Sequence, residues 1–262
     1  MKLLLINSSA RTGGNTARVM ELFEQQLSSL ARESGLDLGI ERVPLARLSL
    51  KPCLGCRACF DRGESACPQE DGLLELYEKM RLADGYIIAS PIYVEDVNGT
   101  LKTMIDRMAF LCHRPALYGK SALLFTTSGI GSSRHALTTM VKAFGTWGIK
   151  TAATAQYNLG ALTAREEVAA RYGKQIERTA RLFLQRMRQS PFRPSLYSLI
   201  AFTVQQALWV RPSVDHDTID YRYWHDSGWL ERGRRYYDPA LAKTPKAIIA
   251  RGLGKIIALF FG

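Results

Sequence analysis

Along the first 189 positions, short continuous apolar runs alternate with longer segments whose apolar residues recur at helical spacing. Short apolar runs are typical of strands buried on both faces, and spacings of three and four are typical of amphipathic helices. The runs predict strands at residues 3–6, 38–43, 85–89, 121–126 and 150–155. The spaced segments predict helices at residues 16–34, 72–81, 100–112, 133–147 and 164–189.

This order of elements predicts an α/β fold, with a doubly wound five-stranded parallel sheet covered by helices on both faces. Such sheets bind ligands at the carboxyl ends of their strands, and the most unusual loops of the chain follow predicted strands there. After residue 189 the pattern changes, with Pro191, Pro194 and Pro212 interrupting it. We therefore expect a binding domain over residues 1–189 and a helical extension over residues 190–262.

Composition narrows the class of protein. A chain of 262 residues, 47% of them hydrophobic, suits one domain with an extension. The net charge of +11 suits an anionic partner but does not select one. No apolar stretch reaches the roughly 20 residues of a membrane span, and the apolar start is too short for a secretory signal. We expect a cytoplasmic protein without an integral membrane segment.

The loop after the first strand, N-S-S-A-R-T-G-G-N-T at residues 7–16, has the composition of a phosphate-binding turn. It aims backbone N–H groups and a helix N-terminus at one point. It matches neither of the glycine patterns for triphosphates and dinucleotides, so a monophosphate fits better. Alternatively, the segment is a plain turn in which Asn15 or Thr16 caps the next helix. The candidate phosphate ligands are Ser9, Arg11, Asn15 and Thr16.

Two further loops carry a family resemblance. S-P-I-Y-V-E-D-V-N-G follows the third strand from residue 90, and T-T-S-G-I-G-S-S follows the fourth over residues 126–133. With the phosphate loop and a cysteine segment, residues 1–189 resemble the flavodoxin-like NAD(P)H-dependent FMN reductases, and among them the iron-sulfur flavoproteins. The resemblance implies strand order 2-1-3-4-5, bound FMN and NAD(P)H as cosubstrate. The acidic pair Glu95 and Asp96 departs from the small residues that the family often has there.

The resemblance implies roles for individual residues. The first loop would bind the FMN phosphate, the second would lie along the isoalloxazine, and the third would close its other side. The flavin carries the chemistry in such enzymes, so no catalytic acid or base is expected in the protein. The implied isoalloxazine contacts are Pro91, Ile92, Tyr93, Val94, Thr127, Ser128, Gly129 and Gly131, with Asn98 nearby as a further cofactor-binding residue.

Four of the five cysteines lie within residues 53–67, spaced C-x2-C-x2-C-x7-C through Cys53, Cys56, Cys59 and Cys67. The C-x2-C-x2-C run is a known three-ligand wrap for a 4Fe-4S cluster, and the similar motif of iron-sulfur flavoproteins implies the same. Redox-active thiols without a cluster are a second interpretation. Zinc is a third, less favoured because structural zinc sites usually draw on two separated ligand pairs.

The extension ends in a basic apolar segment at residues 246–261. It could lie on anionic lipid as a peripheral contact. Packing on the core or across a dimer interface is the favoured interpretation, because the apolar stripe is short. No nucleic-acid-binding motif accompanies Arg232, Arg234 and Arg235, so no nucleic acid partner is expected. A homodimer or homotetramer is expected.

These observations predict an FMN-dependent oxidoreductase that takes hydride from NAD(P)H and passes electrons to a flavin, a quinone or a protein acceptor. A cluster at the four cysteines would pass them singly. Two alternatives from other classes stay open. One is a non-enzymatic electron carrier of the flavodoxin type, and the other is a redox or metal sensor that responds through residues 53–67.

Overall fold

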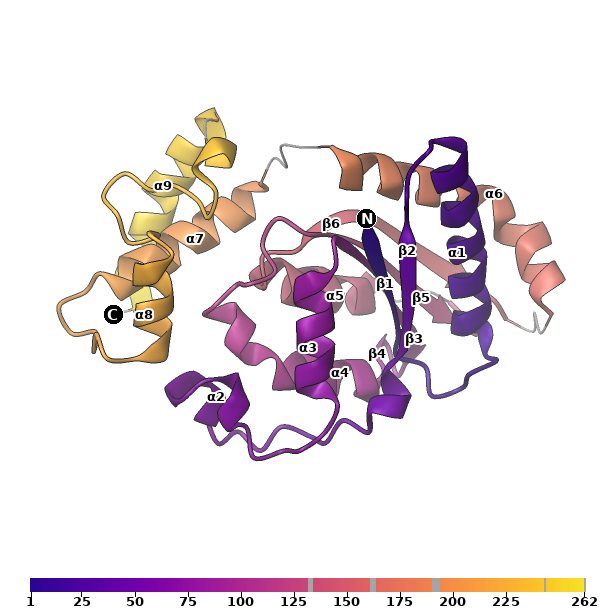
Figure 1. The fold of residues 1–262 in the computed structure, drawn as a ribbon, viewed down its shortest axis with the longest axis horizontal. Helices are drawn as coiled ribbons and strands as arrows, with labels where there is room; N and C mark the ends of the chain where they lie inside the picture. The colour runs from indigo at the N-terminus through magenta and orange to yellow at the C-terminus, as the bar shows by residue number, and fades with distance from the viewer. Residues whose placement is uncertain (132–133, 161–163, 190–193, 243, 262) are drawn as a thin grey trace.

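A computed structural model of the chain describes residues 1–131, 134–160, 164–189, 194–242 and 244–261. Its centre is a parallel sheet of strand order β2-β1-β3-β5-β6, with a short strand β4 paired antiparallel to β3 (Figure 1). The five parallel strands, taken in chain order, therefore have the predicted order 2-1-3-4-5. The strand bounds are β1 Lys2–Asn7, β2 Gly39–Pro44, β3 Gly85–Tyr93, β4 Asp96–Val97, β5 Ser121–Ser128 and β6 Lys150–Asn158.

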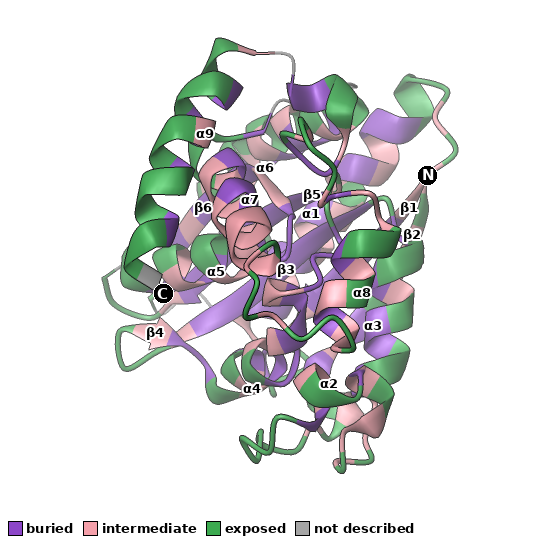
Figure 2. Ribbon diagram, turned by 90° about the vertical axis from the view of Figure 1, so that its left-hand side faces the viewer, coloured by how far each residue is buried: buried purple, intermediate pink, exposed green. Residues whose placement is uncertain are grey.

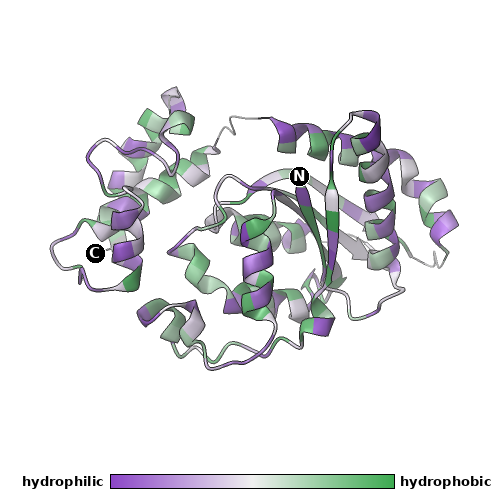
Figure 3. Cartoon of the chain, viewed as in Figure 1, coloured by the Kyte–Doolittle hydropathy of each residue, from purple (hydrophilic) through white to green (hydrophobic). Residues whose placement is uncertain are grey.

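Helices cover both faces of this sheet, as predicted. One buried cluster joins the sheet to α3, α4 and α5, and another joins it to α1 and α6. The central strands β1, β3 and β5 are buried on both faces over most of their length, whereas the helices alternate hydrophilic and hydrophobic residues (Figures 2 and 3). The bounds are α1 Asn15–Glu33, α2 Ala58–Asp61, α3 Leu73–Leu82, α4 Gly99–Arg107, α5 Arg134–Thr146 and α6 Arg165–Arg188.

Two predicted boundaries differ from the structure by the most residues. Strand β3 does not end at Ala89 but continues to Tyr93, because Ile92 and Tyr93 pair with Val97 and Asp96 of β4. The predicted helix 100–112 ends its α-helical part at Arg107, and a 3-10 turn over Ala109–Cys112 follows. Residue 133, the expected start of the next helix, lies outside the described residues.

The extension is helical, with α7 Leu196–Trp209, α8 Ile219–Asp226 and α9 Pro245–Ala258. It lies beside the sheet domain at the end opposite α1 and α6 (Figure 1). It has a buried cluster of its own, rich in aromatic rings and centred on Phe202, Trp224 and Trp229. Among the helices of the described ranges, none is long and apolar enough to cross a membrane.

Candidate functional site

Thr16 and Thr127 link the first predicted loop to the third. Their Oγ1 atoms lie 2.7 Å apart, and both residues are buried. Thr16 is in the first turn of α1, and Thr127 is near the carboxyl end of β5, opposite Pro91 of β3 in the sheet register. Three segments separated by dozens of residues therefore meet at one edge of the sheet, as the sequence predicted.

Asn98 links the loop that follows β1 to the β3–β4 segment, and it does so from a buried position. Its side-chain Nδ2 donates to the carbonyl of Ser8 at 2.7 Å, and its Oδ1 accepts from the Ser8 hydroxyl at 2.7 Å. The same Oδ1 accepts from the backbone N–H of Leu101, which makes Asn98 the N-cap of α4. Asn98 is 2% exposed, so the structure places it beneath the loops as their brace, not at their surface.

The predicted phosphate-binding turn ends at the N-terminus of α1, which no side chain of the described residues caps. Gly14, not Asn15 or Thr16, is the N-cap residue. The first backbone N–H groups of a helix have no partner within the helix. Arg11 is exposed beside this terminus, while Asn15 accepts a hydrogen bond from Arg18 at 2.8 Å. The expected N-cap at Asn15 or Thr16 is therefore wrong, and the phosphate-binding role of the turn stays a prediction.

The second segment forms a strained hairpin between β3 and β4. Both turn residues, Val94 and Glu95, have positive φ angles, 47° and 69°. This turn geometry favours Asn-Gly, and a β-branched residue in it is an outlier. Val94 is 99% exposed and Tyr93 46% exposed, so a large apolar surface stands out at the tip. Such strain is found where a loop's shape serves binding.

Asn158 is a site residue that the sequence reasoning missed. It stands at the carboxyl end of β6, where its side-chain amide can donate to the carbonyl of Gly129 at 2.9 Å and accept from the N–H of Gly131 at 3.2 Å. Ser128 also donates to the carbonyl of Gly131. A polar residue at the end of the fifth strand was the available signal, but the predicted strand stopped at residue 155.

The thirteen predicted flavin-contacting residues all lie at this edge but differ in exposure. Arg11, Tyr93, Val94, Gly129 and Gly131 are exposed, and Asn15, Ile92 and Ser128 are half-buried. The other five are buried beneath them: Ser9, Thr16, Pro91, Asn98 and Thr127.

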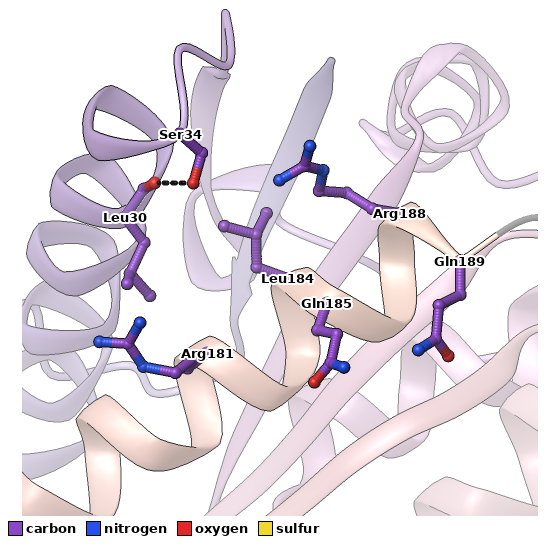
Figure 4. Close-up of a pocket in the computed structure, with 7 residues that line it drawn as sticks. All are labelled: Leu30, Ser34, Arg181, Leu184, Gln185, Arg188 and Gln189. Atoms are coloured by element: carbon purple, nitrogen blue, oxygen red, sulfur yellow. Dashed lines mark hydrogen bonds between the residues drawn. The ribbon is translucent and has the colours of Figure 1, made fainter.

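Two of the cavities in the described part of the chain bear on where a ligand could bind, and neither is lined by all three loops. One of about 490 Å³, at the carboxyl ends of β1 and β2, is lined by Ser9 and by Arg47 but not by the other two loops. The other, of about 390 Å³, lies between the last turns of α1 and α6, where Arg181 and Arg188 are the charged lining residues (Figure 4). Since α1 and α6 end at the amino-terminal edge of the sheet, this second cavity is at the wrong edge for a ligand of this fold class.

All four clustered cysteines line one small cavity of about 90 Å³. Its walls also include Gly55 and Arg57, both with positive φ, which turn the chain between successive cysteines. The N–H of Gly55 donates to the sulfur of Cys53 at 3.5 Å. Burial raises the pKa of the Cys59 thiol. The cysteines are free of disulfides.

A buried ion pair holds the two ends of the cysteine segment together. Arg107 Nη1 and Asp71 Oδ2 are 2.6 Å apart, and both side chains are 2% exposed. Arg107 also donates to the carbonyls of Lys51 and Gln69, which lie on the two sides of the segment. Burial alone would raise the pKa of the Asp71 carboxyl, but hydrogen bonds from Arg107 and from backbone N–H groups outweigh it and lower the pKa. Arg107 and Asp71 therefore hold residues 51–71 as a closed loop.

Arg107 also faces the cysteine cavity, of which it is a lining residue. Its Nε is buried and has no hydrogen-bond partner among the described residues. Burial would lower the pKa of the guanidinium, but Asp71 and, to a smaller extent, the Cys67 sulfur raise it. A cation with a spare N–H donor beside four thiols suits an anionic thiolate-bound group. No three His, Cys, Asp or Glu side chains in the described ranges are grouped as ligands of one metal ion.

Comparisons with known proteins give the family. Over 150 residues the chain is 32% identical to an iron-sulfur flavoprotein of Archaeoglobus fulgidus, covering 57% of this chain and 64% of the relative. It is 37% identical over 107 residues to an iron-sulfur flavoprotein of Methanocaldococcus jannaschii, which covers 41% of this chain and 51% of that relative. The chain thus spans between about half and just under two thirds of these relatives.

Solved structures agree on the fold. RosB with a bound 8-demethyl-8-formylriboflavin-5'-phosphate superposes with a TM-score of 0.53 at 19% identity, over 73% of this chain and 82% of RosB. An FMN-dependent NADH-azoreductase from Bacillus anthracis in complex with FMN superposes with a TM-score of 0.54 at 16% identity. The match covers 69% of this chain and 98% of the azoreductase. The family model described as NADPH-dependent FMN reductase matches residues 1–163. The chain therefore belongs to the NADPH-dependent FMN reductase family.

Proposed function

We propose that the chain is an FMN-dependent oxidoreductase that accepts hydride from NAD(P)H and passes electrons to a flavin, a quinone or a protein. The observation that carries the proposal is the meeting of three loop segments at one sheet edge, joined by Thr16 and Thr127 and by Asn98. Family membership supports FMN as the ligand. FMN supplies hydride and single-electron chemistry when bound, and the protein supplies position and polarity.

The chain's own residues would act by binding and orientation. The N-terminus of α1 and the Arg11 guanidinium would hold a phosphate dianion through backbone N–H groups and a charge-assisted bond. Tyr93 and Val94 would lie against one side of the ring system, where the strained hairpin presents them. The N–H groups of the 129–131 loop would meet the pyrimidine edge, which gains negative charge on reduction.

We also propose that the four cysteines hold a 4Fe-4S cluster, as the names of the relatives suggest. The cavity, its four thiols and the adjacent guanidinium fit such a group. A single zinc ion needs its ligands grouped about one point, whereas a cluster bonds each thiolate to a different iron. A cluster here would exchange single electrons. Helix α4 runs from the brace residue Asn98 to the cavity residue Arg107, about 13 Å along its axis.

Anaerobic purification followed by an absorption spectrum and by iron and sulfide analysis tests the FMN proposal and the cluster proposal separately. Bound FMN with four irons and four sulfides per chain is the expected result. FMN without iron would reject the cluster but keep the reductase. A protein that binds no added FMN would reject the proposal. Rapid bleaching of the flavin on mixing with NADPH or NADH is expected, and no bleaching with either nucleotide would indicate a flavodoxin-type carrier instead.

Substitution at the loop junction sharpens the flavin test. Thr16→Val removes one partner of the Thr16–Thr127 bond and is expected to weaken FMN affinity at least about tenfold, because a buried hydroxyl is left unpaired. Thr138→Val is the matched control, since Thr138 is exposed on α5 and bonds only within that helix. Equal FMN affinity in the two variants would contradict the assigned role of the junction.

A further inference from the structure

Helix α9 packs against α7 through its smallest residues. Ala247, Ala250, Gly254 and Ala258 are buried, and they recur every three or four positions along one side. The approach is close, because a Cβ at Gly254 would lie 2.7 Å from the Cβ of Thr203 on α7. The side of α9 that faces the protein therefore has almost no large apolar side chain to bury.

The opposite side of α9 carries the large apolar residues and leaves them in solvent. Ile249 is 57% exposed, Ile256 56% and Phe260, just beyond the helix, 83%. With about 3.6 residues per turn, these positions fall on one outward face. Figure 2 shows α9 at the margin of the molecule beside α7, with exposed residues along most of its length. The face is completed by Ile248, Leu253, Ile257 and Leu259, which are also exposed.

The charges around this face are all positive. Lys246, Arg251 and Lys255 are the charged residues of α9, and no acidic residue follows Asp238 in the sequence. On a helical projection Lys246 lies at one border of the apolar face and Lys255 at the other. A broad apolar face bordered by Lys and Arg is the pattern of a helix that lies in the plane of a membrane surface.

We propose that α9 and Phe260 form a peripheral docking surface for an anionic phospholipid membrane. Ile249, Ile256 and Phe260 would enter the acyl boundary, while the ammonium and guanidinium groups would meet lipid phosphates. A second copy of this chain is the less favourable occupant. Two such faces in contact would bring cations together with no acidic residue of α9 to offset them. This proposal differs from the interpretation favoured from the sequence, which was packing of the apolar stripe on the core or across a dimer interface.

Vesicle co-sedimentation of the full chain tests the proposal. Wild-type protein is expected to bind vesicles of phosphatidylglycerol and phosphatidylcholine, to bind phosphatidylcholine alone at least about tenfold more weakly, and to lose affinity as salt rises. The double variant Ile249→Asp with Ile256→Asp should lose at least about tenfold in affinity for the anionic vesicles. Leu82→Asp is the matched control, since Leu82 is 72% exposed at the end of α3, and it should bind like wild type.

Phe260→Ser keeps the test valid if the double variant does not fold, because it removes an apolar contact beyond the end of α9. It should also weaken binding, by about threefold or more. Two results would overturn the proposal. One is the absence of wild-type binding to anionic vesicles. The other is a wild-type oligomer that the double variant converts to monomers while vesicle affinity stays unchanged, which would identify the face as a self-association surface.

Discussion

Arg107 and Asp71 form an ion pair of 2.6 Å from which water is almost excluded. The pair is built from the end of α4 and from the residue before the N-cap of α3, and it closes the loop that carries the four cysteines. It therefore couples the packing of the sheet domain to the shape of the cysteine cavity.

Arg107→Ala is expected to lower the free energy of unfolding by about 3–5 kcal/mol, because it leaves a buried carboxylate without its partner. Urea denaturation followed by circular dichroism measures the change. Arg181→Ala is the control, since the Arg181–Glu177 pair is exposed on α6 and should contribute less than about 1 kcal/mol. Similar losses in the two variants would mean that the Arg107–Asp71 pair is no more stabilising than a surface pair.

The pH dependence of stability should report the same pair. The pKa of Asp71 is lowered in the folded chain, so its contribution to stability is complete above the ordinary aspartate pKa of about 4 and is lost as the pH falls through the lowered value. The stability difference between wild type and Asp71→Asn should be constant near neutrality and shrink below about pH 4. A difference that instead grew on acidification would contradict the assigned direction of the shift.

The β3–β4 hairpin can be used to test whether its strained backbone at Val94 and Glu95 serves FMN binding at the expense of stability. Replacing Val94 by Asn and Glu95 by Gly supplies residues that accept positive φ, and should raise the free energy of unfolding by about 1 kcal/mol. The same change removes the exposed Val94 side chain and should weaken FMN binding. Ser49→Gly is the control, because Ser49 also has a positive φ, 50°, but is not part of the three loops. It should raise stability without altering FMN affinity, measured by fluorescence titration.

Two glycines of α9 give opposite expectations for the same substitution. Gly254→Ala places a methyl group 2.7 Å from Thr203 and should separate α9 from α7, seen as faster hydrogen exchange in α9. At Gly252 a Cβ meets nothing within 4 Å, so Gly252→Ala should stabilise the helix by up to about 1 kcal/mol. Slower exchange at both positions would show that the α7–α9 approach is looser than the structure has it.

The sheet could be predicted well because burial on both faces produces continuous apolar runs, and the order of strands and helices then admits few topologies. The ends of the strands were less predictable. Pro91 and Tyr93 look like loop residues locally, but Pro91 pairs with Thr127 of β5 and Tyr93 pairs with Asp96 of β4, which makes both part of β3. Helix capping by Gly14 was also missed, since Asn15 and Thr16 have the stronger local preference.

Long-range polar contacts explain the rest of what the sequence did not predict. Asn98 was expected near the flavin-contacting loop, but its bonds to Ser8, 90 positions away in the chain, could not be read from the local sequence. Nothing in the local sequence distinguishes Arg107 or Asp71 from solvent-exposed charges. The outward-facing isoleucines of α9 were assigned to packing because periodicity identifies an apolar face without showing which way it points.

Asp220, at the start of α8, bonds to the guanidinium of Arg114, which also donates to the carbonyl of Cys59 at 2.8 Å. Both charged side chains are at most 6% exposed. A shortened chain that stopped near residue 190 would take Asp220 away from this arginine, leave Glu64 as its carboxylate partner, and uncover the side of α2 that α8 contacts. A shorter version of the protein should therefore keep the helical extension, even though the family match ends at residue 163.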